Sequence, residues 1–340
     1  VARQETDRVP FGSFGTNWAD EERIRQHVGA AILEEMYREV GLDLWNIWQP
    51  LVYTGEARRL DGEPADFWGI PASVYRDGDS SQRCPLAEVS SVDEVEAYPW
   101  PSIGDFAPAG LDAELEAHRE FAIIGGVWAP IFHNVTWLCG FENTLVNLVL
   151  QPEVSDALIR KVTDFWVAYV HKTLQHARGR IDIVENCNDF GAQSSLILSP
   201  ELFRRHFRPA LQRLYDAIRE HGALVMQHSC GSIRSLVPDF LEMGADILNP
   251  VQVGAAGMDL EGLAADFGGK ATFYGGIDTQ HVLPEGPEDR IREETRRTIG
   301  LLGRDGGYIL AGSQGLEPDI PVEHILVMFD EGRKSSERIP

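Results

Sequence analysis

The C-terminal half of the chain repeats one pattern of hydrophobic and polar positions. A short apolar run ends in small or polar residues, an amphipathic helical stretch follows, and a glycine precedes the next run. The apolar runs cover 223–227, 246–251, 272–277 and 308–311, and their starts lie 23, 26 and 36 residues apart. This spacing is typical of consecutive βα units in a parallel sheet.

Further apolar runs precede this half of the chain. They are Phe121–Trp128, Ile181–Asn186 and the weaker candidates Val9–Phe14 and Leu42–Trp48. Eight strands that alternate with helices predict a (β/α)8 barrel, which needs about 250 residues. The surplus lies mainly in residues 53–106, where a hairpin is expected around Phe67–Tyr75. We therefore expect one barrel domain over residues 1–340, with residues 53–106 inserted over one barrel mouth.

A doubly wound open sheet is the alternative fold for this pattern. Nucleotide-binding sheets of that kind carry a glycine-rich phosphate turn after a strand, such as G-x-G-x-x-G or G-x-x-x-x-G-K-[ST]. Neither motif follows a predicted strand of this chain. The barrel is therefore the favoured architecture.

The charge of the chain limits its partners. The sequence has 30 Lys and Arg against 53 Asp and Glu, a formal net charge of −23 at pH 7. Such a surface repels nucleic acid and anionic lipid, and no basic run offsets it. Four cysteines without framework spacing indicate reduced thiols, and no apolar stretch reaches the roughly 18 residues of a membrane span. We expect a cytoplasmic protein without a signal peptide that binds neither nucleic acid nor membranes.

The strongest candidate chemistry follows the strand at 223–227, because the carboxyl ends of barrel strands carry the active site. His228 and Cys230 are two residues apart, so their side chains point to the same side of an extended backbone. An imidazole and a thiolate that converge in this way suit zinc, and Gly231 lets the chain turn away. The structural alternative is a hydrogen-bonded buried histidine beside an inert cysteine.

The preceding strand also ends in polar residues. Neighbouring parallel strands end side by side, so we expect Glu185 or Cys187 to lie beside His228 and Cys230. Glu185 and Asp189 are also candidates for acid–base catalysis. The alternative is a helix-entry loop that uses its polar side chains in turn hydrogen bonds.

Two later strands end in small residues beside a polar side chain. Gly275 and Gly276 precede Asp278, whose carboxylate is a candidate proton carrier or a simple helix N-cap. The last strand exits through Gly312-Ser313-Gln314-Gly315, which places Gln314 at the same mouth.

Aromatic residues follow the early strand ends. They are Trp18, Trp45, Trp48, Trp128, Phe132 and His133. Single aromatic side chains usually belong to the core, but as a group these fit the wall of an apolar substrate pocket. Trp18, Trp48, Trp128 and His133 are the predicted substrate contacts.

Several motifs together resemble the uroporphyrinogen decarboxylase superfamily, a (β/α)8 barrel group that also contains zinc-dependent cobamide methyltransferases. The matching segments are Asp7-Arg8-Val9-Pro10, Asp66-Phe67-Trp68-Gly69-Ile70, Gly140-Phe141-Glu142, Asn188-Asp189-Phe190-Gly191-Ala192-Gln193, Ser199-Pro200-Glu201-Leu202-Phe203, His228-Ser229-Cys230-Gly231, Leu248-Asn249-Pro250-Val251-Gln252, Gly275-Gly276-Ile277-Asp278 and Asp319-Ile320-Pro321-Val322-Glu323. They run almost from end to end, and they are specific for the superfamily rather than for one activity.

Two branches of the superfamily differ in their site residues. The decarboxylases carry an Arg-rich segment after the first strand that holds the carboxylates of the porphyrinogen, whereas residues 11–18 contain no basic residue. The methyltransferase branch carries H-x-C on one strand and a third metal ligand, usually Cys, at a later strand exit. His228 and Cys230 match the first two ligands, and Gln314 stands at the later position. The resemblance therefore implies zinc bound by His228 and Cys230, with Glu185, Cys187 or Gln314 completing the site.

The resemblance implies a corrinoid-dependent methyltransferase that moves a methyl group between a small molecule and a cobamide carried by a partner protein. The aromatic residues favour a methoxylated aromatic as the small molecule. The alternative is a metal-free decarboxylase or lyase of a small carboxylic acid, in which Asp278 or Asp189 carries the proton. A non-catalytic binding barrel is the third hypothesis.

Overall fold

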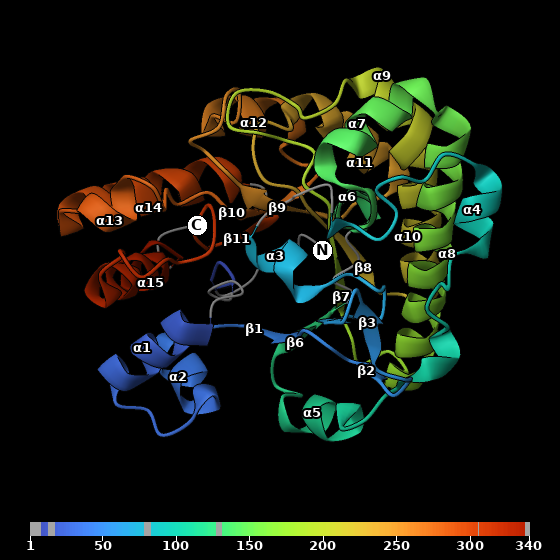
Figure 1. Cartoon of the computed structure of the whole chain (residues 1–340). Coiled ribbons are helices and arrows are strands. Elements are labelled where there is room, and N and C mark those ends of the chain that lie inside the picture. The colour runs from blue at the N-terminus through green and yellow to red at the C-terminus, as the bar shows by residue number, and fades with distance from the viewer. Residues whose placement is uncertain (1–7, 13–17, 78–82, 127–130, 305, 337–340) are drawn as a thin grey trace.

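The computed structural model describes residues 8–12, 18–77, 83–126, 131–304 and 306–336. Its centre is a sheet of 7 parallel strands in the order β1-β6-β7-β8-β9-β10-β11 (Figure 1). The strands are β1 (Leu44–Ile47), β6 (Ala122–Gly126), β7 (Ile183–Cys187), β8 (Leu224–His228), β9 (Ile247–Val251), β10 (Thr272–Gly275) and β11 (Tyr308–Ile309). These seven predicted strands are confirmed.

The sheet curls into a barrel that closes through the first predicted strand. Phe11 forms a parallel bridge with Leu310, which directly follows β11. The carbonyl of Phe11 accepts the N–H of Asp43 at 3.0 Å, and the N–H of Leu310 donates to the carbonyl of Pro10 at 2.9 Å. In its described part, the predicted strand Val9–Phe14 is thus reduced to one bridged residue. The open-sheet alternative is wrong, because backbone hydrogen bonds join the two ends of the sheet.

Side chains alternate between the barrel interior and the surrounding helices, as the two-residue period of a strand requires. An interior cluster contains Leu44, Ile124, Ile183, Met226, Ile247, Tyr274 and Ile309. The adjacent residue on each strand belongs instead to a second, larger cluster, which includes the core between the sheet and the helices. These adjacent residues include Trp45, Ile123, Val184, Val225, Leu248 and Phe273. Strands that are covered on both faces read as continuous apolar runs, which is the pattern seen in the sequence.

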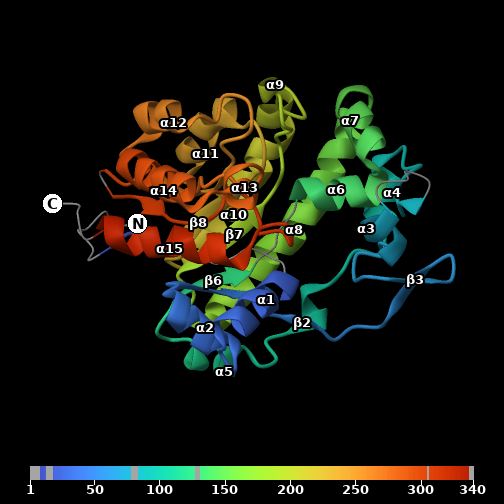
Figure 2. The ribbon, with the colours of Figure 1, turned by 90° about the vertical axis from the view of Figure 1, so that its left-hand side faces the viewer.

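Helices connect the strands and surround the sheet (Figures 1 and 2). The helices are α1 (Trp18–Val28), α2 (Leu33–Val40), α5 (Leu111–Ala117), α6 (Ile131–Cys139), α7 (Phe141–Leu150), α8 (Pro152–Ala177), α9 (Pro200–Leu202), a π-helical segment (Phe203–Phe207), α10 (Arg208–Glu220), a 3-10 turn (Arg234–Leu236), α11 (Val237–Met243), α12 (Leu260–Phe267), α13 (Val282–Glu285), α14 (Glu288–Leu302) and α15 (Val322–Ser336). Within the described ranges, none of the helices combines the length and apolar character that a membrane crossing needs.

The insertion packs beside the C-terminal mouth of the barrel. Its elements are β2 (Val52–Tyr53), β3 (Arg58–Leu60), β4 (Glu63–Ala65), α3 (Ala72–Asp77), α4 (Val92–Ala97), a 3-10 turn (Ile103–Asp105) and β5 (Phe106–Ala107). Figure 2 shows β3, α3 and α4 on the same side of the molecule as α6 and α7. Phe67 and Phe106 of the insertion line one cavity together with Trp48 and Gly126, which lie at the ends of β1 and β6. The predicted placement over a barrel mouth agrees with this arrangement.

The prediction of a hairpin around Phe67–Tyr75 is wrong. The hairpin of the insertion pairs β3 with β4, and its two-residue turn places Asp61 at φ 48° and Gly62 at φ 85°. Asp-Gly is a sequence typical of this turn, because both positions need positive φ. The chain after Asp66 instead makes a tight turn, since its carboxylate accepts the backbone N–H groups of Trp68 and Ile70.

Candidate metal centre at the barrel mouth

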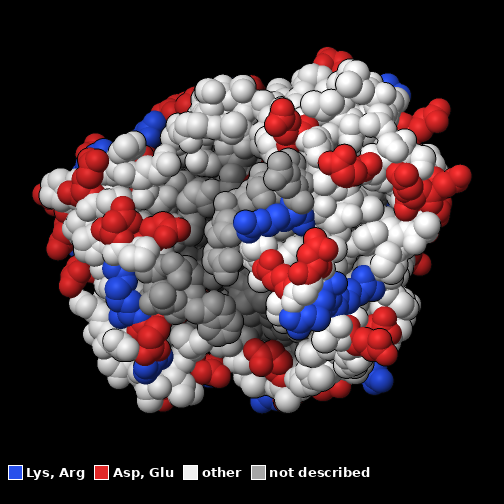
Figure 3. All heavy atoms as spheres, viewed as in Figure 1, with Lys and Arg blue, Asp and Glu red and all other residues white. Residues whose placement is uncertain are grey.

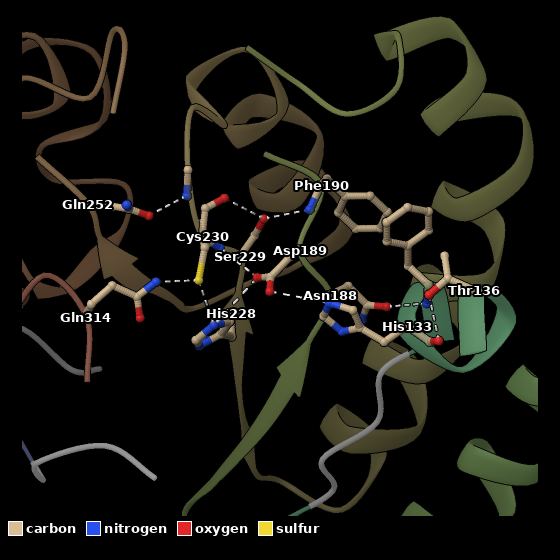
Figure 4. Close-up of polar contacts among 12 residues, drawn as sticks. His133, Thr136, Asn188, Asp189, Phe190, His228, Ser229, Cys230, Gln252 and Gln314 are labelled. Carbon is tan, nitrogen blue, oxygen red and sulfur yellow. Dashed lines mark hydrogen bonds and ion pairs between the residues drawn. The ribbon is translucent and has the colours of Figure 1, made fainter. Parts of the chain in front are cut away.

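The end of β8 brings His228 and Cys230 together. His228 lies two residues after Met226, which belongs to the interior cluster, so its ring also faces the barrel interior. Nε2 of His228 lies 3.4 Å from Sγ of Cys230 (Figure 4). Both residues are partly buried at the mouth of the barrel.

Close packing of two strand-end loops brings Asp189 to the same point. Gly231 has φ +81°, and a Cβ there would lie 2.6 Å from the backbone of Gly191, so only glycine fits. With the loops this close, Oδ1 of Asp189 accepts the N–H of Cys230 at 2.8 Å. This hydrogen bond fixes the carboxylate beside the imidazole and the thiol.

Asp189 completes a group of three metal-ligand side chains. Its Oδ1 lies 3.6 Å from Nε2 of His228, and one ligand atom each from Asp189, His228 and Cys230 lies within 4.8 Å of the others. Burial alone would raise the pKa of Asp189, but the hydrogen bond from His133 and the charge of His228 lower it below its ordinary value. The carboxylate is therefore an anion. From sequence, Asp189 was expected to carry a proton rather than to bind a metal.

The other ring nitrogen of His228, Nδ1, has two polar partners of its own. Nδ1 lies 2.7 Å from Oδ1 of Asn249 and 3.1 Å from Oε1 of Glu185, so Glu185 lies on the opposite side of the ring from Asp189. Such partners orient a ligating imidazole and set its tautomer. Burial opposes charge on the ring, yet the pKa of His228 is raised well above its ordinary value by Cys187, Cys230 and Glu185. The structure thus places Glu185 as a partner of His228 rather than beside Nε2.

Gln314 and Cys187 were the other expected ligands. Nε2 of Gln314 lies 2.7 Å from Sγ of Cys230, which makes the amide a hydrogen-bond donor to the sulfur. Cys187 is buried at the end of β7, and burial raises the pKa of its thiol. It belongs to a second group, in which the ligand atoms of His133, Cys187 and Asp189 lie within 4.8 Å of one another.

His133 reaches this group from the first turn of α6. Its Nε2 lies 3.3 Å from Oδ2 of Asp189, and its ring stacks on Trp137 with centroids 5.3 Å apart. The start of α6 is fixed by buried Asn188, whose Oδ1 accepts the N–H of Phe132 at 2.7 Å. Buried Asn188 thereby positions His133 in the first turn of α6.

The remaining predicted residues have other surroundings. The carboxylate of Asp278 accepts the N–H groups of Gln280 and His281 and so caps a turn. Trp45 packs outside the barrel, where it stacks on His118 with centroids 3.6 Å apart. Trp128 and the side chain of Trp18 lie outside the described residues.

An aromatic cavity of about 680 Å³ has Trp137, the stacking partner of His133, in its lining. Its aromatic lining includes Trp48, Phe67, Trp68, Phe106, Trp137 and Trp166. None of its described lining residues is Lys or Arg, and Asp66 is its one described carboxylate. The stacking of His133 on Trp137 connects this cavity to Asp189. A flat apolar ligand suits such walls better than a polyanion.

Basic residues near the first strand are engaged elsewhere. Arg8 forms an ion pair with Asp43 at 2.7 Å, and Arg23 donates to the carbonyl of Ile320 at 2.8 Å. Figure 3 shows basic side chains beside acidic ones over the described part of one face, without a continuous basic field. The described residues therefore provide no cluster of cations for a polycarboxylate at this face.

Comparison with known proteins places the chain in a family. Residues 107–335 match the family model for uroporphyrinogen decarboxylase (URO-D). The chain belongs to this family. The resemblance carried by the sequence motifs is confirmed.

Individual relatives are distant. The chain is 24% identical to a uroporphyrinogen decarboxylase of Chlamydia caviae over 185 residues, which are 54% of this chain and 52% of the relative. It is 28% identical to that of Thermus thermophilus over 131 residues, 38% of this chain and 35% of the relative. The chain therefore spans about half or less of the curated relatives it matches. Their activity does not transfer on this similarity alone.

A solved structure supports the fold over nearly the whole chain. The chain superposes on a methyltransferase from Methanosarcina mazei with a TM-score of 0.66 and 16% identity, covering 97% of this chain and 94% of that one. At 16% identity, the structural similarity shows that the two proteins share a fold. The chain thus belongs to an enzyme superfamily whose fold a methyltransferase shares.

Proposed function

We propose that the protein is a zinc-dependent methyltransferase that moves a methyl group between a methoxylated aromatic and a cobamide carried by a partner protein. One observation carries the proposal: Asp189, His228 and Cys230 converge at the barrel mouth. Asp189 also contacts His133, whose ring stacks on Trp137 in the wall of an aromatic cavity that has no described Lys or Arg in its lining. The family motif H-x-C and the shared methyltransferase fold support the same assignment.

The three side chains fit a zinc ion. Zinc–ligand bonds of about 2.0–2.3 Å at tetrahedral angles place the ligand atoms about 3.3–3.8 Å apart. Nε2 of His228 lies 3.4 Å from Sγ of Cys230 and 3.6 Å from Oδ1 of Asp189. Imidazole, thiolate and carboxylate are all zinc ligands, and three of them leave a fourth position for a substrate atom. Zinc bound there would supply a Lewis acid for the oxygen that loses the methyl group.

The other residues have binding and positioning roles in this proposal. Asn249 and Glu185 hold Nδ1 of His228 and thereby direct Nε2 toward the ligand position. Trp48 and Trp137 stack on the aromatic ring of the substrate and exclude water from it. Gln314 stands where the family usually has a third cysteine, and Asp189 takes over the role of the third ligand.

The test combines metal analysis with a methyl-transfer assay. We expect stoichiometric zinc in the purified protein by elemental analysis. Incubation with cob(I)alamin and a panel of methyl donors should yield methylcobalamin, followed by its absorbance, with a methoxylated aromatic as the donor. Turnover of methanol or methylamines without any aryl ether would disprove the aromatic substrate only. Carbon dioxide release from a small acid, with no methyl transfer from any donor, would replace the proposal by the decarboxylase alternative.

Removing the partner of Nδ1 provides a graded test. In Asn249→Ala, Nδ1 of His228 loses its closest hydrogen-bond acceptor, at 2.7 Å. We expect zinc affinity to fall about 10–100-fold, because partners behind a ligating histidine contribute that much. Competition with a chromophoric chelator measures the change. Asn147→Ala on α7, which removes a partly buried hydrogen bond that Gln151 donates to Asn147, is the matched control and should bind zinc as the wild type does.

A further inference from the structure

A second set of metal-ligand side chains lies next to the first. His133 comes from α6, Cys187 from the end of β7, and Asp189 from the loop that follows β7. Their ligand atoms lie within 4.8 Å of one another, and Cys187 is 1% exposed. Neither His133 nor Cys187 is a ligand in the function proposed above.

The carboxylate of Asp189 faces two imidazoles at once. Oδ2 lies 3.3 Å from Nε2 of His133, whereas Oδ1 lies 3.6 Å from Nε2 of His228 (Figure 4). Both distances fall within the range of about 3.3–3.8 Å that separates two ligand atoms on one tetrahedral zinc ion. A carboxylate that offers one oxygen to each of two ligand sets has the arrangement of a bridging ligand between two metals.

The ring of His133 is held with one nitrogen directed at Asp189. Its Nδ1 is buried without a hydrogen-bond partner among the described residues, and the ring is held by stacking on Trp137. The ring thus presents Nε2 toward Asp189 and Cys187.

We propose that the barrel mouth holds two divalent metal ions, one bound by His228 and Cys230 and one by His133 and Cys187, with Asp189 bridging them. Paired metals in enzymes lie about 3.5–4 Å apart and bind two oxygens of one substrate. The second position adjoins Trp137 of the aromatic cavity, so the second ion would bind a substrate oxygen on that side. The inference goes beyond the proposed methyl transfer and shares Asp189 with its zinc site.

Cobalt titration under anaerobic conditions tests the second position. The protein is freed of metal with a chelator, Co2+ is added, and the thiolate-to-cobalt absorbance is followed to its end point. We expect two equivalents for the wild type and one each for Cys187→Ser and Cys230→Ser. His133→Ala should also bind one tight equivalent, which excludes a defect specific to the cysteine change. Cys139→Ser, a buried cysteine on α6, is the matched control and should keep two.

The possible end points separate this inference from the proposed function. One equivalent in the wild type, lost in Cys230→Ser and kept in Cys187→Ser, would overturn the second position and leave the zinc site intact. One equivalent that is lost in both variants would mean that both thiolates hold a single ion, which also overturns the inference. A wild type that binds no cobalt would overturn both proposals. Circular dichroism of each variant verifies that it is folded before the end points are compared.

Discussion

Replacing Cys230 by serine is expected to remove one zinc equivalent per chain and to eliminate methyl transfer. Sγ of Cys230 stands 3.4 Å from Nε2 of His228, and its backbone N–H anchors Asp189, so the sulfur is central to the group. A neutral hydroxyl is a much poorer zinc ligand than a thiolate. Loss of the hydrogen-bond partners that orient a metal ligand lowers metal affinity about 10–100-fold. Loss of the ligand itself should therefore lower zinc affinity more than 100-fold.

Elemental analysis and the methylcobalamin assay measure this effect. The backbone hydrogen bond from Cys230 to Asp189 survives the substitution, so the loop should keep its conformation. Cys139→Ser is the control, because it makes the same change in a buried side chain of α6 and should keep full zinc and activity. A Cys230→Ser protein with the zinc content and turnover of the wild type would exclude Cys230 as a ligand.

The barrel could be predicted because its strands are covered on both faces. The apolar runs at 223–227 and 246–251 correspond to β8 and β9 within one residue, since burial on both faces leaves little choice of residue type. The closing strand was harder to predict. The carbonyl of Phe11 accepts a backbone hydrogen bond from Asp43, and its neighbours Pro10 and Gly12 make the backbone hydrogen bonds to Leu310. Backbone hydrogen bonds between distant segments leave little trace in the pattern of side chains.

The metal-ligand group could be predicted only in part. The spacing of His228 and Cys230 fixes their common side, because successive side chains of an extended chain alternate. The position of Asp189 depends instead on the close packing of two loops at Gly191 and Gly231, which no local pattern encodes. For the same reason the orientation of Glu185, behind the imidazole rather than beside Nε2, needed the structure.

The residues that line the aromatic cavity could be predicted only in part from the strand ends. Trp48 follows β1 and lines the cavity, whereas Trp45 lies within β1 and points outward, as alternation along a strand requires. Most of the aromatic lining comes from the insertion and from α8, such as Phe67 and Trp166. Contacts between segments this far apart in sequence depend on tertiary packing, so the sequence indicated an aromatic pocket and, of its lining, only Trp48.

Trp68→Ala is expected to destabilise the protein by about 3–5 kcal/mol, the usual cost of truncating a fully buried aromatic side chain. Trp68 is 1% exposed and joins the insertion to α8, with its ring 4.8 Å from that of Phe165 in an edge-to-face contact. Such a contact contributes about 0.5–1.5 kcal/mol to stability beyond the contribution of the buried area. Urea unfolding followed by far-UV circular dichroism measures the shift.

Leu150→Ala, at a side chain 73% exposed, should change stability by less than about 0.5 kcal/mol. Equal unfolding midpoints for Trp68→Ala and the wild type would contradict the packing of the insertion on α8, and with it the wall of the cavity.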